Sequence, residues 1–125
     1  MIGYITLGTN NIDKAAAFYD ELFASIGIGR FMEGDHFIAW AKAPDTPAFS
    51  VIKPYDGNTA TSGNGTMISL AMESPEQVAE FHAKALTLGG SDEGAPGVRD
   101  GGSLYISYFR DLDNNKLAAY TMATE

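Results

Sequence analysis

The residues most capable of chemistry in this sequence are two histidines and a pair of aspartates. Histidine binds metals and transfers protons near neutral pH. His36 opens a predicted strand, where it either lines the mouth of a cavity or simply follows a turn, and His82 lies on a predicted helix, where packing is the simpler role. We expect the two to face different sides of the fold and not to share a metal. Asp111 and Asp113 could bind Ca²⁺, but they lack the spaced oxygen donors of an EF-hand loop, so we interpret them as turn-capping residues.

Nucleophilic and phosphate-binding chemistry has little support. Ser50, Ser69 and Ser103 have no evident histidine and acid partners, so no catalytic triad is predicted. The stretches Gly94-Ala-Pro-Gly97 and Gly101-Gly102 are rich in glycine without phosphate-loop spacing, and we expect a mobile flap beside a cavity. Cysteine is absent, which excludes disulfides, thiolate nucleophiles and cysteine-bound metals.

The bulk properties narrow the class of protein. A chain of 125 residues corresponds to a single domain, 1–125, and it contains no apolar run long enough for a membrane span. The net charge of −8, from 16 acidic and 8 basic residues, argues against a nucleic-acid partner. The acidic balance either favours a cationic small molecule or only keeps the protein soluble. The first residues lack a basic region before a long apolar segment, so we predict no secretion signal and a cytoplasmic location.

Apolar periodicity predicts the elements that must position these residues. The first module, about 1–55, has one strand, one helix that Gly27 ends, and three further strands; these lie at 2–9, 12–26, 28–33, 36–42 and 49–54. A linker without periodicity follows at about 56–65. The second module, about 66–125, repeats the pattern with a strand at 66–72, a helix from Ser74 to about Leu88, a loop or short edge strand at 91–102, and a hairpin at 105–120.

The two modules are an internal repeat. A shift of 63 residues places Tyr4 on Met67, and the matches that follow fall on positions expected to face a core: Ile5 with Ile68, Leu7 with Leu70, Ala16 with Ala79, Phe18 with Phe81 and Gly27 with Gly90. Each module is too small to bury its own apolar face, so two modules in tandem are expected to pack together. The predicted fold is α+β, with two βαβββ modules whose sheets curve into a half-open mixed β barrel with the helices outside. Its concave face is the default binding site.

Three stretches resemble the vicinal oxygen chelate superfamily, which includes glyoxalases, extradiol dioxygenases and bleomycin resistance proteins. They are Tyr4-Ile-Thr-Leu-Gly-Thr9 with Phe18-Tyr19, Glu80-Phe-His-Ala-Lys-Ala-Leu with Gly89-Gly90, and Phe109-Arg-Asp-Leu-Asp-Asn-Asn-Lys-Leu117. The resemblance covers nearly the whole chain. It implies the same two-module fold and a homodimer, because small members commonly pair.

The sequence departs from this superfamily where its metal-dependent members hold a divalent ion. The resemblance implies that the three positions that carry metal ligands in those members are occupied here by Tyr4, Met67 and Ala118. A fourth ligand position, used by some members, corresponds to Ser50. Such a metal needs imidazole and carboxylate ligands, which these four residues do not supply. We therefore predict no metal and no other cofactor.

The remaining candidates form an aromatic and apolar lining. We predict ligand-binding residues on the concave face and on the strands beside it; they are Tyr4, Thr6, His36, Trp40, Ser50, Met67, Ser69, Ile106, Tyr108, Ala118 and Tyr120. Phe31 and Phe37 lie on bordering strands without an assigned face. These side chains either bind a flat ligand or fill the barrel as core and dimer interface.

Two functions remain open. The first is metal-independent binding of an aromatic or cationic small molecule by a protein of the bleomycin-resistance type. The alternative is an isomerase or lyase in which Tyr108 or Tyr4 acts as acid or base, which requires a cation close to the phenol because a tyrosine of ordinary pKa is a weak base at neutral pH.

Overall fold

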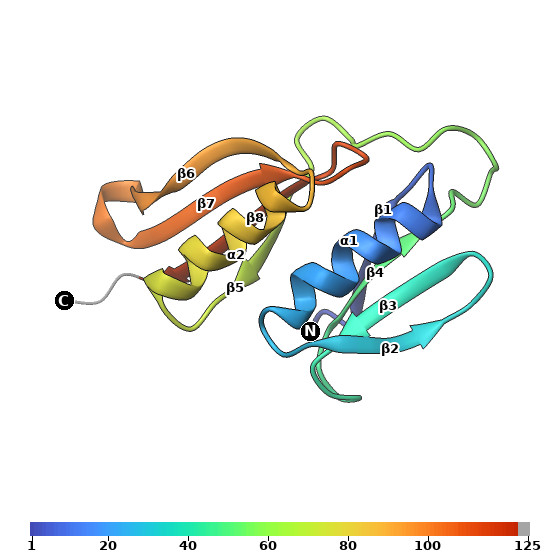
Figure 1. The fold of residues 1–125 in the computed structure, drawn as a ribbon, viewed down its shortest axis with the longest axis horizontal. Helices are drawn as coiled ribbons and strands as arrows, with labels where there is room; N and C mark the ends of the chain where they lie inside the picture. The colour runs from blue at the N-terminus through green and yellow to red at the C-terminus, as the bar shows by residue number, and fades with distance from the viewer. Residues whose placement is uncertain (123–125) are drawn as a thin grey trace. The chain divides into compact units, whose positions relative to one another are not determined.

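The computed structural model describes residues 1–122 and contains two βαβββ modules in tandem (Figure 1). The chain divides into two compact units, which we call unit 1 (Met1–Ser62) and unit 2 (Gly63–Glu125). Each unit has one helix and one four-stranded mixed sheet, so the predicted α+β class with two modules is confirmed. Among residues 1–122 the strands are hydrogen-bonded into two separate four-stranded sheets, one in each unit.

Unit 1 is built on a sheet of order β1-β4-β3-β2. Its elements are β1 (Tyr4–Gly8), α1 (Ile12–Ala24), β2 (Gly29–Glu33), β3 (Phe37–Ala41) and β4 (Ala48–Ile52). The side chain of Asn11 accepts a hydrogen bond from the backbone N–H of Lys14, which caps the start of α1. The apolar side of α1 buries Tyr19, Leu22 and Phe23 against one face of the sheet, which leaves the other face for a site.

Unit 2 repeats this plan with a sheet of order β5-β8-β7-β6. Its elements are β5 (Ile68–Ala71), α2 (Pro75–Thr87), β6 (Ser91–Arg99), β7 (Leu104–Arg110) and β8 (Lys116–Met122), with a short 3₁₀ turn between β6 and β7. The side chain of Ser74 caps α2 by accepting a hydrogen bond from the backbone N–H of Gln77. The rings of Phe81 on α2 and Phe109 on β7 meet between helix and sheet, with centroids 6.1 Å apart.

The internal repeat is visible in the burial of matched residues. Phe18 and Phe81, which the shift of 63 residues superimposes, are 3% and 1% exposed and occupy the same place on α1 and α2. The division at Ser62 falls within the segment predicted as a linker. Asn10 exchanges hydrogen bonds with the backbone of Ala60, which fastens the end of unit 1 to the turn after β1.

One element is longer than predicted. Residues 91–102 were expected to be a loop or a short edge strand, and β6 is an edge strand of nine residues paired along the length of β7. Two register shifts, one before and one after Gly94, interrupt the pairing. The segment Gly94-Ala-Pro-Gly97 hides the alternation that identifies a strand, because glycine has no side chain to mark a face and proline is confined to edges and bulges.

Within residues 1–122, no helix is both long and apolar enough to cross a membrane.

Candidate functional site

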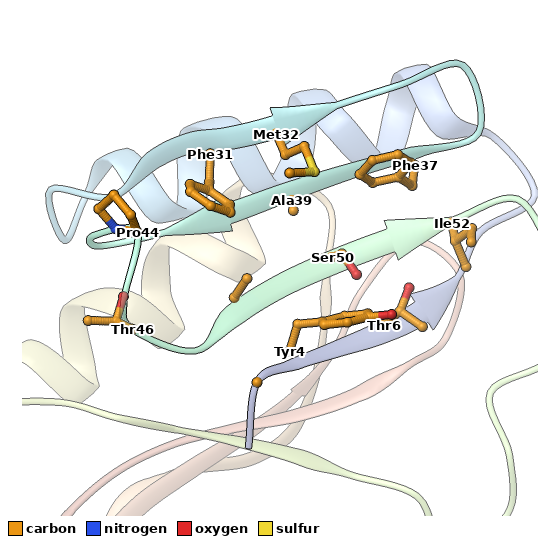
Figure 2. Close-up of a pocket in the computed structure, with 12 residues that line it drawn as sticks. Tyr4, Thr6, Phe31, Met32, Phe37, Ala39, Pro44, Thr46, Ser50 and Ile52 are labelled. Carbon is orange, nitrogen blue, oxygen red and sulfur yellow. The ribbon is translucent and has the colours of Figure 1, made fainter. Parts of the chain in front are cut away.

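A pocket of about 460 Å³ opens on the face of the unit 1 sheet that points away from α1 (Figure 2). All of its lining residues belong to unit 1; they are Gly3, Tyr4, Thr6, Phe31, Met32, Phe37, Ala39, Pro44, Thr46, Ala48, Ser50 and Ile52. Its volume lies within the range of small-molecule sites, which is roughly 300–1,000 Å³.

Strand alternation explains why these residues converge. Thr6 on β1 pairs with Ser50 on β4, and Ser50 pairs with Ala39 on β3, so the three side chains form one row across the sheet. Residues two positions away along each strand point to the same side. Tyr4 and Ile52 therefore join the same face, as Figure 2 shows.

A bulge in β2 places two large side chains at the edge of the pocket. The pairing of β2 with β3 shifts between Arg30 and Met32, which leaves Phe31 as the extra residue. Both Phe31 and Met32 line the pocket, although strict alternation would send them to opposite faces. A bulge cannot be read from apolar periodicity, so the sequence left Phe31 without an assigned face and missed Met32.

The pocket wall is mostly apolar with a few hydroxyl groups. Tyr4, Thr6, Thr46 and Ser50 supply the hydroxyls, and none of the lining residues is acidic or basic. The Ser50 Oγ donates to the backbone carbonyl of Ile5 at 2.8 Å, so this hydroxyl is fixed in orientation. The tyrosine is 71% exposed, which leaves its ring free to cover a ligand.

Trp40, which the sequence predicted as a ligand-binding residue, does not line this pocket. It is 1% exposed and lies on the α1 side of the sheet, with ring centroids 5.6 Å from Tyr19 and 5.8 Å from Phe23. Its indole Nε1 donates to the Asp20 carboxylate at 2.9 Å. The strand Phe-Ile-Ala-Trp-Ala is apolar throughout, so its sequence does not show which residues face the helix.

His36 was also assigned to the site and does not line the pocket. It lies in the exposed turn before β3, and its backbone carbonyl accepts from the N–H of Lys53. The structure thus brings together three predicted unit 1 residues, Tyr4, Thr6 and Ser50, and leaves two outside.

The predicted residues of unit 2 share the sheet face opposite α2. Tyr108 pairs with Ala118, Ile106 with Tyr120, and Ala118 with Ser69, so these five lie on one side. Met67 directly precedes β5 and is 39% exposed. Ile106 and Ala118 are buried, so they form part of the packed interior more than an open surface.

Two cations flank Tyr108, which the sequence did not reveal. The Arg99 Cζ lies 5.9 Å and the Lys116 Nζ 5.2 Å from the centroid of its ring. Arg99 is the last residue of β6, a segment predicted only as a loop or a short edge strand, so its approach to Tyr108 on β7 could not be predicted.

The other candidates have structural roles. His82 is buried between α2 and β7, and its Nε2 lies 3.1 Å from a carboxylate oxygen of Asp92. The backbone N–H of Gly94, assisted by His82, holds the pKa of Asp92 below its usual range. Asp111 accepts from the backbone N–H groups of Asp113 and Asn115 and thus organises the β7–β8 turn.

The four superfamily metal positions do not fit a divalent ion. Tyr4 is largely exposed, Met67 and Ala118 lack an oxygen or nitrogen donor, and the Ser50 hydroxyl is directed to a backbone carbonyl. Across residues 1–122, no three side chains of histidine, aspartate or glutamate gather into a metal-binding group.

Comparison with solved structures identifies the family. A glyoxalase/bleomycin resistance protein from Albidiferax ferrireducens T118 is 36% identical, with 97% of this chain and 98% of that chain covered and a TM-score of 0.88. This chain belongs to the glyoxalase/bleomycin resistance protein family. Neither a protein-family model nor a curated protein matches it.

More distant members of the glyoxalase/bleomycin resistance protein family share the fold. A family enzyme from Burkholderia phytofirmans PsJN is 16% identical, with 95% of this chain and 96% of that chain covered and a TM-score of 0.77. A lactoylglutathione lyase from Agrobacterium tumefaciens is also 16% identical, with 97% of this chain and 92% of that chain covered and a TM-score of 0.71. Identities this low support the architecture alone.

Proposed function

We propose that this protein binds a flat, largely apolar small molecule in the unit 1 pocket without the help of a metal. The observation that carries the proposal is the pocket itself, an open cavity walled by Tyr4, Phe31, Met32 and Phe37. Aromatic rings and a thioether give a ligand broad apolar contact, and the hydroxyls of Thr6 and Thr46 can orient a polar group.

The pocket favours an uncharged aromatic ligand over a cationic one. None of its lining residues carries a carboxylate, so a buried cation would lose its hydration without a compensating partner. The net charge of −8 attracts cations to the surface as a whole, but it does not place a negative group in this wall.

Matched probes test this preference. Thermal-shift and calorimetric titrations compare 2-naphthol, 2-naphthylmethylamine as a cationic counterpart, and cyclohexanol as a non-aromatic one. We expect 2-naphthol to bind and to raise the melting temperature most, because a ligand that binds only the folded state stabilises it. Stronger binding of the amine, or no binding of any aromatic probe, contradicts the proposal.

A pocket-filling variant locates the binding. Ala48 lines the pocket, so Ala48→Phe places a ring inside it and is expected to weaken naphthol binding by about tenfold or more. Ala17→Phe adds the same group on the exposed side of α1 and is expected to leave binding unchanged. Equal affinity in both variants excludes this pocket as the site.

An enzyme that uses Tyr108 as acid or base is the second candidate. The observation that favours it is the pair of cations, Arg99 and Lys116, beside the Tyr108 ring, since a developing phenolate needs positive charge nearby. Isomerase and lyase substrates with an acidic C–H bond provide the assay. Turnover that Tyr108→Phe abolishes supports this candidate, and a rate unchanged by the substitution removes it.

A further inference from the structure

The face of the unit 2 sheet opposite α2 gathers basic side chains in a chain that is otherwise acidic. Arg99, Arg110 and Lys116 lie on this face, although the chain has only 8 basic residues against 16 acidic ones. Arg110 and Lys116 are direct cross-strand partners, and like charges opposite each other destabilise a sheet. Something must offset that repulsion.

Carboxylates offset only part of it. Arg110 pairs with Glu93 at 3.2 Å and donates to the carbonyl of Asn114. Arg99 donates to the backbone carbonyl of Ala95, and within residues 1–122 neither Arg99 nor Lys116 forms an ion pair with an acid. Each lies instead against the ring of Tyr108, Arg99 from β6 with its Cζ 5.9 Å from the ring centroid and Lys116 from β8 with its Nζ 5.2 Å from it.

Two glycines make room for this arrangement. A Cβ at Gly94 would lie 2.8 Å from Cδ2 of Tyr108, and one at Gly97 would lie 3.0 Å from Nη1 of Arg99. Any other residue at these two positions would displace the tyrosine or the guanidinium group. The glycines of β6 thus permit the close approach of the three side chains.

We infer that Arg99, Tyr108 and Lys116 form a binding site for a small oxyanion, either a carboxylate or a phosphate group. The guanidinium group offers a planar pair of N–H donors and the ammonium a second positive charge. Across residues 1–122 the Tyr108 hydroxyl makes no hydrogen bond, so it is available as a third donor. This inference concerns unit 2 and does not depend on the pocket in unit 1.

Anion titrations of the full chain test the site. Benzoate, phenyl phosphate and inorganic phosphate are added at constant ionic strength, with benzamide as the uncharged control, and binding is followed by calorimetry and by amide chemical shifts. We expect at least one of the anions to bind, with shifts concentrated at 94–99 and 116–118, and benzamide to have no effect there. Benzoate binding alone assigns a carboxylate site, and binding of both phosphates assigns a phosphate site.

Charge-removing variants decide whether these residues hold the anion. Arg99→Gln and Lys116→Gln are each expected to weaken binding by about tenfold, because each removes a charged donor. Lys84→Gln removes the same charge from α2, on the other face of the sheet, and is expected to have no effect. No anion binding by the intact protein, or an equal loss in all three variants, overturns the inference. Binding of 2-naphthol in the unit 1 pocket does not depend on these anion titrations. Absence of the anion site can therefore be distinguished from failure of the proposed function.

Discussion

At the residue scale, Asp20 shows how one carboxylate fixes the wall behind the pocket. It receives two hydrogen bonds from Arg30 on β2, at 2.9 and 2.7 Å, and one from the indole of Trp40 on β3. The bonds from Arg30, assisted by Trp40, hold the pKa of Asp20 below its usual range. The carboxylate thereby joins α1 to the two strands that carry Phe31, Met32 and Ala39 on their other face.

Removing this charge is expected to make unit 1 less stable in a pH-dependent way. Because the pKa of Asp20 is lowered on folding, its contribution is complete above the unfolded value of about 3.9 and is lost as the pH falls through the folded value. Asp20→Asn should therefore cost roughly 1 kcal/mol at pH 7, a figure reduced for partial exposure, and less below pH ~4.

Urea unfolding followed by fluorescence measures this difference, since Trp40 is the only tryptophan and reports on unit 1. Asp35→Asn, which removes a charge from the exposed turn before β3, is the control. If Asp20→Asn lowers the free energy of unfolding by the same amount at pH 7 and at pH 3, the charged Asp20 carboxylate does not stabilise unit 1 in the way described.

At the element scale, the end of α2 depends on a close approach to β7. Gly90 donates its backbone N–H to the carbonyl of Ala85, and a Cβ at Gly90 would lie 2.8 Å from the carbonyl oxygen of Arg110 and 2.9 Å from that of Ala85. Both obstacles are backbone atoms, so they cannot rotate away as a side chain does. The helix can pack on its sheet in this way only with glycine at position 90.

Gly90→Ala is accordingly expected to destabilise the protein by about 1–3 kcal/mol, the usual cost of forcing an extra methyl group into a packed region. Gly29→Ala on β2 has open space around the added Cβ and should be neutral or stabilising by about 0.4–1 kcal/mol. Circular dichroism during urea unfolding measures both variants. Equal stability of the two would show that the contact at Gly90 is not rigid.

The sequence predicted the helices and strands far better than it predicted which side of a sheet each side chain occupies. Within residues 1–122, apolar spacing located both helices and seven of the eight strands, because this signal is local, and it left the eighth as a loop or a short edge strand. The side of the sheet occupied by Trp40 depends on the register between β3 and β4, which an all-apolar strand does not encode. The placement of Phe31 and Met32 depends on a bulge, and that of Arg99 on a strand interrupted by glycines.

At the scale of the whole molecule, unit 1 leaves a set of apolar side chains uncovered. Ile2, Tyr4, Phe31 and Met32 are 55%, 71%, 44% and 51% exposed. Exposed apolar patches mark binding sites or interfaces between proteins. A small ligand covers only part of this set, and a second copy of the chain is the partner that the family resemblance implies.

We therefore predict a homodimer in solution. Sedimentation equilibrium should give about twice the chain mass of 13.3 kDa, with dissociation on dilution. The increase in mass should persist at high salt, because burial of apolar surface is not screened by ions. A mass of 13.3 kDa at every concentration would contradict this prediction.

The central claim is that a member of this family binds an apolar ligand through its unit 1 pocket without a metal. The most direct measurement is a calorimetric titration of 2-naphthol into the protein before and after exhaustive treatment with a chelator. The structure predicts the same affinity in both titrations, because the wall formed by Tyr4, Phe31, Met32 and Phe37 supplies the contacts. Loss of binding after chelation, with recovery when a divalent metal is restored, would contradict the claim.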